Sequence, residues 1–172
     1  MKLIFLFIFL TLSFGTFSQG TKSDTVKTLQ EIVRYENSIS MPGVGYGGVP
    51  SRQWYASAFL ISSVTTDELL EMTKDPSEGL RLCAFIGLAY YKYPYLNLVR
   101  QTLTGDTTTI LSLEGCVIDE TTIGYAVNHI EQWNTTNPMK LLLQRMRADN
   151  EYRDKLFDAL VDKKRIVRFN QL

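Results

Sequence analysis

The stretch SEGLRLCAFIGLAYYKY, residues 77–93, decides the fold of this chain. No residue between Leu82 and Tyr91 is charged, so a helix formed from them has no polar face to turn toward solvent. A helix that is apolar on every side is buried on every side. About ten residues are also too few to cross a bilayer, which takes about 20. The stretch therefore predicts a central helix with other helices packed around it.

Apolar residues recur at helical spacing on both sides of this stretch. The first such segment runs from Asp24 to about Ser38, with Asp24 placed to cap it. Ser51 can cap a second helix, and Thr65 with Glu68 has the spacing of a capping box that opens a third. Further helices are predicted near residues 96–103, 123–130, 138–146 and 150–160.

Two segments break the helical pattern. Residues 41–51, MPGVGYGGVPS, are so rich in Gly and Pro that they predict a loop. Residues 107–110 are β-branched, which disfavours helix and suits extended chain. Glu114 and Gly115 then supply a turn, so we expect irregular structure with a minor strand within residues 105–120.

Together these patterns predict an all-α domain. About seven short helices joined by short loops are typical of a compact layered array rather than of a four-helix bundle. Residues 20–172 amount to about 150 residues, which is the size of one ordinary domain with a core of its own.

The first 19 residues have the layout of a secretory signal peptide. Lys2 gives a positive start, residues 3–12 form a nearly unbroken apolar run, and small residues follow near Gly15. A transmembrane anchor needs a longer apolar run than this. We therefore expect residues 1–19 to be cleaved, the mature chain to have no stable membrane insertion, and its location to be periplasmic or extracellular.

Residues 67–89, DELLEMTKDPSEGLRLCAFIGLA, resemble a single HEAT-type helical repeat. The matching positions are Leu69, Leu70, Asp75, Pro76, Leu80, Arg81, Ala84 and Leu88. The resemblance implies a helix pair whose apolar positions pack together while the turn acid caps the second helix. It also implies a layered scaffold that binds other proteins, since one such unit needs neighbours to bury its face. Residues 96–112 are a weaker copy, with Ser112 where the repeat has Arg.

Charge and motif content exclude several classes of function. The chain has 18 Lys and Arg against 18 Asp and Glu, whereas a nucleic-acid-binding protein normally has a basic excess. Gly43, Gly45 and Gly48 spell G-x-G-x-x-G, but the dinucleotide motif follows a strand and opens a helix, and here a predicted helix precedes it. His129 is the only histidine, and metal sites combine several ligands. The sequence predicts no cofactor and no metal.

The candidate binding residues are aromatic. Tyrosine joins an apolar ring to a polar hydroxyl and is enriched at recognition surfaces, although packing at a helix junction explains the same residues. One cluster, at the end of the central helix, consists of Tyr90, Tyr91, Tyr93 and Tyr95. Tyr46 and Trp54, near the Gly-rich loop, form a second candidate patch.

The two cysteines leave alternatives open. Export permits a disulfide between Cys83 and Cys116, whereas the apolar surroundings of Cys83 suit a free buried thiol equally well. A small hydrolase would require Cys116, His129 and Asp119 to converge in one cleft.

The sequence favours a non-enzymatic, exported helical module that binds a protein or peptide. The signal peptide, the HEAT-like segment and the absence of a catalytic motif carry this expectation. A small exported hydrolase and a purely structural envelope protein are the alternatives.

Overall fold

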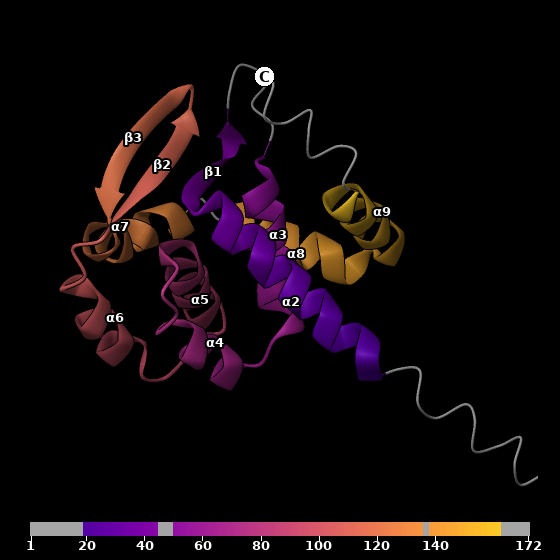
Figure 1. The fold of residues 1–172 in the computed structure, drawn as a ribbon, viewed down its shortest axis with the longest axis horizontal. Coiled ribbons are helices and arrows are strands. Elements are labelled where there is room, and N and C mark those ends of the chain that lie inside the picture. Colours follow the sequence, from indigo (N-terminus) through magenta and orange to yellow (C-terminus); the bar gives the residue numbers. More distant parts are fainter. Residues whose placement is uncertain (1–18, 45–49, 136–137, 163–172) are drawn as a thin grey trace, which may run out of the picture.

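The structure is a computed structural model that describes residues 19–44, 50–135 and 138–162. These ranges contain eight helices and a small three-stranded sheet (Figure 1), so the mostly helical class is confirmed and the sheet is an addition to it. The predicted signal peptide lies outside the described residues except for Gln19. The helices are α2 (Gln19–Glu36), α3 (Arg52–Ser63), α4 (Thr66–Met72), α5 (Glu78–Tyr90), α6 (Leu96–Thr104), α7 (Ile123–Thr135), α8 (Pro138–Ala148) and α9 (Asn150–Val161). The strands are β1 (Ser38–Val44), β2 (Thr109–Gly115) and β3 (Val117–Thr122).

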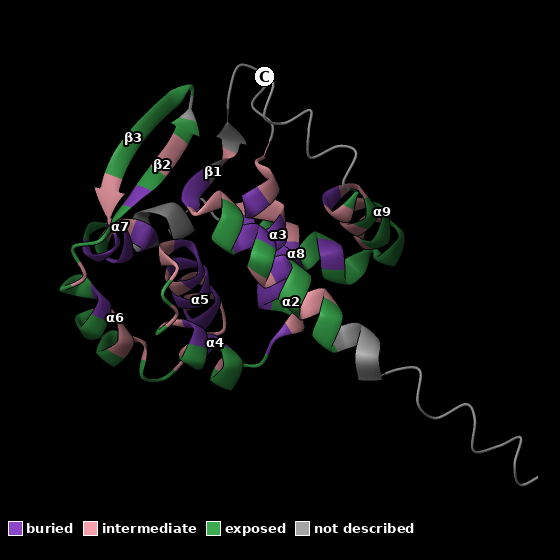
Figure 2. Ribbon diagram, viewed as in Figure 1, coloured by how far each residue is buried: buried purple, intermediate pink, exposed green. Residues whose placement is uncertain are grey.

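The central helix predicted from the sequence is α5. It contacts α2, α3, α4, α6 and α7 as well as β1 and β2, and most of its residues are buried (Figure 2). Its side chains contribute to two apolar clusters. Leu80, Cys83 and Leu88 belong to the first, with residues of α2, α3, α4, α8 and α9. Leu82 and Phe85 belong to the second, with residues of the sheet, α6 and α7.

Local capping signals predict three of the helix starts correctly. The Ser51 side chain accepts a hydrogen bond from the backbone of Trp54 at the start of α3. Thr65 and Glu68 form the complete capping box of α4. Pro138 begins α8, where its missing N–H has no cost.

Two capping expectations are wrong. Asp24 lies inside α2 rather than at its start, because that helix begins at Gln19. Ser77, and not Asp75, is the N-cap of α5. The Asp75 carboxylate instead accepts a hydrogen bond from the Ser77 backbone at 2.9 Å and pairs with Arg34 of α2 at 2.8 Å.

Asn37 turns the chain from α2 into β1. Its backbone is left-handed, with φ of 37°, a conformation that Asn adopts more readily than most residues. Its side-chain oxygen accepts hydrogen bonds from the Gly79 backbone at 2.9 Å and the Ser77 hydroxyl at 3.1 Å. Its amide nitrogen donates to Glu78 at 2.9 Å. The end of α2 is therefore attached to the start of α5.

The sheet has the strand order β1-β2-β3. β1 pairs with β2 in parallel, and β2 with β3 in an antiparallel hairpin in which Glu114 faces Val117. The predicted loop over residues 41–51 is wrong for residues 41–44, which belong to β1, and residues 45–49 lie outside the described ones. The minor strand expected within residues 105–120 is present as the longer hairpin.

Arg81 joins α5 to the loop that leads into β2. Its guanidinium donates to the carbonyl oxygens of Asp75 and Pro76 at 2.8 and 2.9 Å and to the Thr108 hydroxyl at 2.7 Å. Its Nε lies 2.9 Å from the Asp106 carboxylate. Partial burial alone would raise the pKa of Asp106, but hydrogen bonds from Thr108 and the charge of Arg81 outweigh burial and hold that pKa below its ordinary value near 3.8.

Gly124 allows α7 to approach the end of α6. A Cβ atom there would overlap the carbonyl oxygen of Thr104 and lie 3.2 Å from that of Asp106. We expect Gly124→Ala to lower the free energy of unfolding by about 1–3 kcal/mol, measured by urea denaturation. Gly105→Ala is the control, because its Cβ meets no atom within 4 Å and its φ is −81°. Equal effects of the two substitutions would contradict the close approach.

The lowered pKa of Asp106 predicts a pH dependence of stability. A depressed folded-state pKa contributes stability above the unfolded value near 3.8, and this contribution is lost as pH falls through the folded-state pKa. We expect Asp106→Asn to be less stable than the parent at pH 7, with the difference narrowing below about pH 4. Urea denaturation midpoints of the parent and the variant, measured from pH 7 to below pH 4, give this difference in stability. A difference that stays constant with pH would show that the Asp106 carboxylate contributes nothing.

Candidate functional site

The β2–β3 hairpin projects from the helical body (Figure 1). Near its base Ile110 is buried in the second apolar cluster. Farther out, Leu111, Val117 and Ile118 are 46, 62 and 71% exposed. The register places Leu111 and Ile118 on one face of the hairpin and Val117 on the other. Single exposed apolar residues are common on soluble proteins, but three on one short projecting hairpin indicate a contact element. We name Leu111, Val117, Ile118 and the acidic residues Glu114, Asp119 and Glu120 the hairpin surface.

A hollow of about 660 Å³ lies between the hairpin and α7. Tyr125 and His129 of α7 contribute to its lining, with their rings stacked at 3.8 Å between centroids. The Nδ1 of His129 lies 2.8 Å from the Tyr125 carbonyl oxygen, which can only accept, so Nδ1 carries the proton. The hairpin contributes Thr109, Ser112, Glu114, Val117, Asp119, Glu120, Thr121 and Thr122.

The hairpin surface is acidic. Glu114, Asp119 and Glu120 are exposed, and none of them forms an ion pair with another residue that the structure describes. The sequence contains no Lys or Arg from Gln101 to Pro138. A negative field next to exposed apolar side chains favours a partner that is both cationic and apolar.

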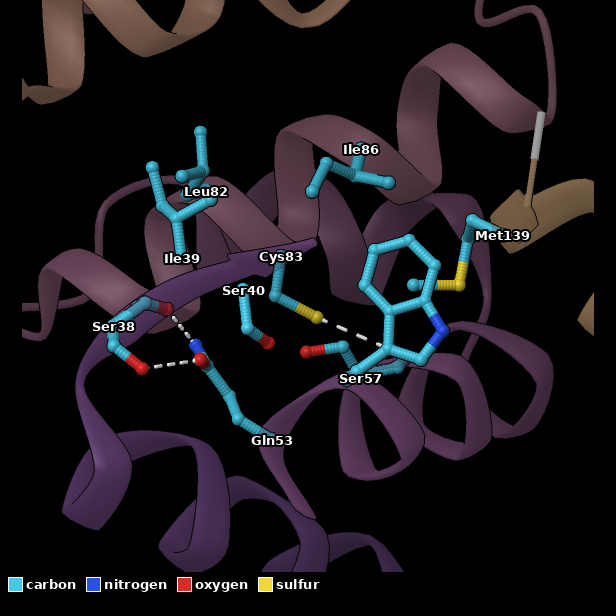
Figure 3. A pocket seen from close by; sticks show the side chains of 11 residues that line it. Ser38, Ile39, Ser40, Gln53, Ser57, Leu82, Cys83, Ile86 and Met139 are labelled. Carbon is cyan, nitrogen blue, oxygen red and sulfur yellow. Dashed lines mark hydrogen bonds between the residues drawn. The ribbon is translucent and has the colours of Figure 1, made fainter. Parts of the chain in front are cut away.

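A second, smaller cavity lies between β1, α3 and α5 (Figure 3). Ser38 donates a hydrogen bond to the side-chain oxygen of Gln53 at 2.6 Å, and the Gln53 amide donates back to the Ser38 carbonyl. The hydroxyls of Ser40 and Ser57 and the thiol of Cys83 turn toward the same space. The cavity measures about 30 Å³, which holds about one water molecule and no organic substrate.

The small cavity has no reactive nucleophile. Burial raises the pKa of the Cys83 thiol to about 12, although a hydrogen bond with the Ser57 side chain acts in the opposite direction. A thiol with such a pKa stays protonated near neutral pH and does not attack substrates. Among the described residues, the lining contains no Asp, Glu, His, Lys or Arg that would act as a base. We assign the cavity to packing.

The predicted tyrosine cluster divides into two edge-to-face pairs. The ring centroids of Tyr90 and Tyr91 are 5.1 Å apart, and those of Tyr93 and Tyr95 are 5.9 Å apart. Tyr91 donates its hydroxyl proton to the Ile61 carbonyl at 2.9 Å, and a guanidinium of α8 lies 5.5 Å from the Tyr90 centroid. Three of the four rings pack against the first apolar cluster, whereas Tyr95 is exposed.

The second predicted aromatic patch lies partly outside the described residues. Trp54 is half-buried, packs against the first cluster and lines the small cavity. Tyr46 lies outside the described residues.

Cys116 does not share a site with His129. Asp119 and His129 both line the hollow, but Cys116 occupies the hairpin turn and is not part of that lining. Of the two alternatives for the cysteines, the structure has the free thiols: Cys83 and Cys116 are not bonded to each other. Cys83 is buried in α5, and Cys116 is exposed.

In the part of the chain that the structure describes, no three His, Cys, Asp or Glu side chains are grouped as a metal site requires. No helix of that part is long and apolar enough to cross a membrane. No family model, curated protein or solved structure matches this chain.

The candidate residues that sequence reasoning missed are those of the hairpin. Leu111, Val117 and Ile118 lie within the segment expected to be largely irregular. Two signals pointed to them: apolar residues at Leu111 and Leu113 alternate with polar ones, and Lys and Arg are absent around them. The tyrosines were chosen instead because residue type alone does not reveal burial.

The different burial of the two cysteines predicts selective labelling. In the native protein a maleimide reagent should react once, at Cys116, and a second time only after denaturation, because burial keeps Cys83 inaccessible and protonated. Intact mass measures both states without reductant. Cys116→Ser is the control and should show no native labelling. Absence of labelling even after denaturation would instead reveal a disulfide.

Proposed function

We propose that this protein is a non-enzymatic module that binds a protein or peptide, and that the hairpin surface is its contact site. The observation that carries this proposal is the joint exposure of Leu111, Val117 and Ile118 on a projecting element. Covering such side chains releases their hydration water, which is the main driving force of protein association. The adjacent hollow offers room for side chains of the partner.

The arrangement of reactive groups supports a binding role over a hydrolase. Nucleophilic catalysis needs a nucleophile and its base within hydrogen-bond reach. Cys83 is buried with a raised pKa, and Cys116 lies outside the lining that contains His129. The hollow is open and its carboxylates are exposed, so it lacks the water-excluded setting that strengthens catalytic electrostatics.

The proposal also includes export and a HEAT-like layering of the helical body. The layout of residues 1–19 supports export, and the mass of the protein recovered from the producing cell would test cleavage. The contact between α4 and α5 supports the layering. After α6 the chain enters β2 rather than a second helix, so the proposal covers this helix pair and its neighbours and not a regular superhelix.

Site-specific photo-crosslinking tests the proposed surface. A photoreactive amino acid replaces Ile118 in one chain and Leu141 of α8 in another, since their side chains are 71 and 63% exposed. We expect a discrete adduct in the producing cell from position 118 only. Adding Leu111→Asp should reduce that adduct by about tenfold, because a charge in the centre of an apolar contact is costly to bury.

Circular dichroism of each variant provides the folding control. Leu111 is already 46% exposed, so its replacement should leave thermal unfolding nearly unchanged. Identical adducts from positions 118 and 141, or no adduct from either, would contradict the hairpin surface as the contact site.

A further inference from the structure

We infer that the partner adds an extended, cationic segment to the outer edge of β3, as a fourth strand of the sheet. This inference rests on the proposed function and specifies its partner. Each of its components comes from the hairpin: a backbone edge without a neighbouring strand, carboxylates that form no ion pair with another described residue, and exposed apolar side chains beside them.

The open backbone edge belongs to β3. In the order β1-β2-β3 the two outer strands are β1 and β3. β1 lies against α3, where Ser38 is hydrogen-bonded to Gln53. No strand or helix in the described residues pairs with the other side of β3, and residues 117–120 are all exposed. The Glu120 N–H donates to the Asp119 carboxylate at 2.8 Å, so an added chain would replace that local bond. The remaining N–H and C=O groups along the edge are a template for another extended chain.

The charges of this edge select the partner. Asp119 faces Ser112 and Glu120 faces Leu111 across the hairpin, so neither carboxylate has a cation as its cross-strand neighbour. A strand added at about 4.8 Å from β3 would bring its own side chains next to these carboxylates and to Ile118. Because Val117 and Ile118 precede Asp119 and Glu120 along the strand, two adjacent cations followed by two adjacent apolar residues is the pattern that matches both faces of β3.

A second copy of this chain is disfavoured as the occupant of the edge. Pairing of two β3 strands would bring Asp119 and Glu120 close to the same carboxylates of the other copy. Like charges at close range across a pair of strands are destabilising. The charge of the edge therefore disfavours pairing with a second copy of this chain, which the backbone groups of β3 alone would permit.

The test measures fluorescence anisotropy of a labelled synthetic peptide that repeats Lys-Arg-Val-Val, titrated with the full chain. We expect saturable binding that weakens with added salt. A peptide with Glu in place of Lys and Arg should not bind. A third peptide keeps every charge but carries N-methyl groups on alternate backbone nitrogens, which removes donors needed for strand pairing, and it should also fail to bind.

Two matched pairs of substitutions distinguish the effect of the β3 carboxylates on binding from the effect of the protein's net charge. Asp119→Asn with Glu120→Gln should weaken peptide binding by about tenfold or more. Glu31→Gln with Asp158→Asn removes the same charge from exposed positions on α2 and α9 and should leave binding unchanged. Amide hydrogen exchange of the parent chain should slow in β3 when the peptide is added.

Three outcomes would overturn the inference. Equal binding of the N-methylated peptide would show that charge alone attracts the probe, without strand pairing. Equal weakening by both pairs of variants would place binding away from β3. A dimer in light scattering that is lost on modifying the edge would identify a second copy as the occupant. If the crosslink from position 118 persists while the peptide fails, the hairpin surface stands and only strand addition is lost.

Discussion

The absence of charge from Leu82 to the end of α5 is the constraint on which the rest of the structure depends. Because no side of this uncharged stretch favours contact with water, other elements must cover most of it. Helices cover most of the surface, and the sheet closes the remaining side through Ile39 and Ile110, which belong to the same cluster as Phe85. The sheet therefore helps to bury α5. Its β2–β3 hairpin extends beyond Ile110, the last of its residues in this cluster, and becomes exposed there.

Sequence patterns predicted those elements whose signals are local. Ser51 and the pair Thr65–Glu68 cap helices through hydrogen bonds within one helical turn. The apolar composition of α5 predicts its burial from residues within that one helix. β1 was missed because its strand character comes from pairing Ser38 with Leu111, far along the chain. The start of α2 was missed because the polar residues before Asp24 carry no apolar period, although they are compatible with helix.

The candidate site was harder to predict than the fold. Tyrosine content pointed to the junction after α5, where three of the four rings pack against the core. The exposure of Ile118 depends on how far the hairpin reaches beyond Ile110, and this is a property of the tertiary structure. Arg81 and Asp106 likewise meet only because α5 and the loop before β2 lie side by side. Residue type alone predicted neither the exposure of Ile118 nor the ion pair between Arg81 and Asp106.

The division of α5 between two clusters has a consequence for how the protein unfolds. Leu88 stabilises one cluster and Phe85 the other, although both belong to the same helix. Loss of either cluster exposes apolar surface of α5 to water and so weakens its neighbour. The two halves of the helical body are thus thermodynamically coupled and should melt as one cooperative unit. Neither half is an autonomous subdomain, and division of the chain within α5 would leave two fragments without a core.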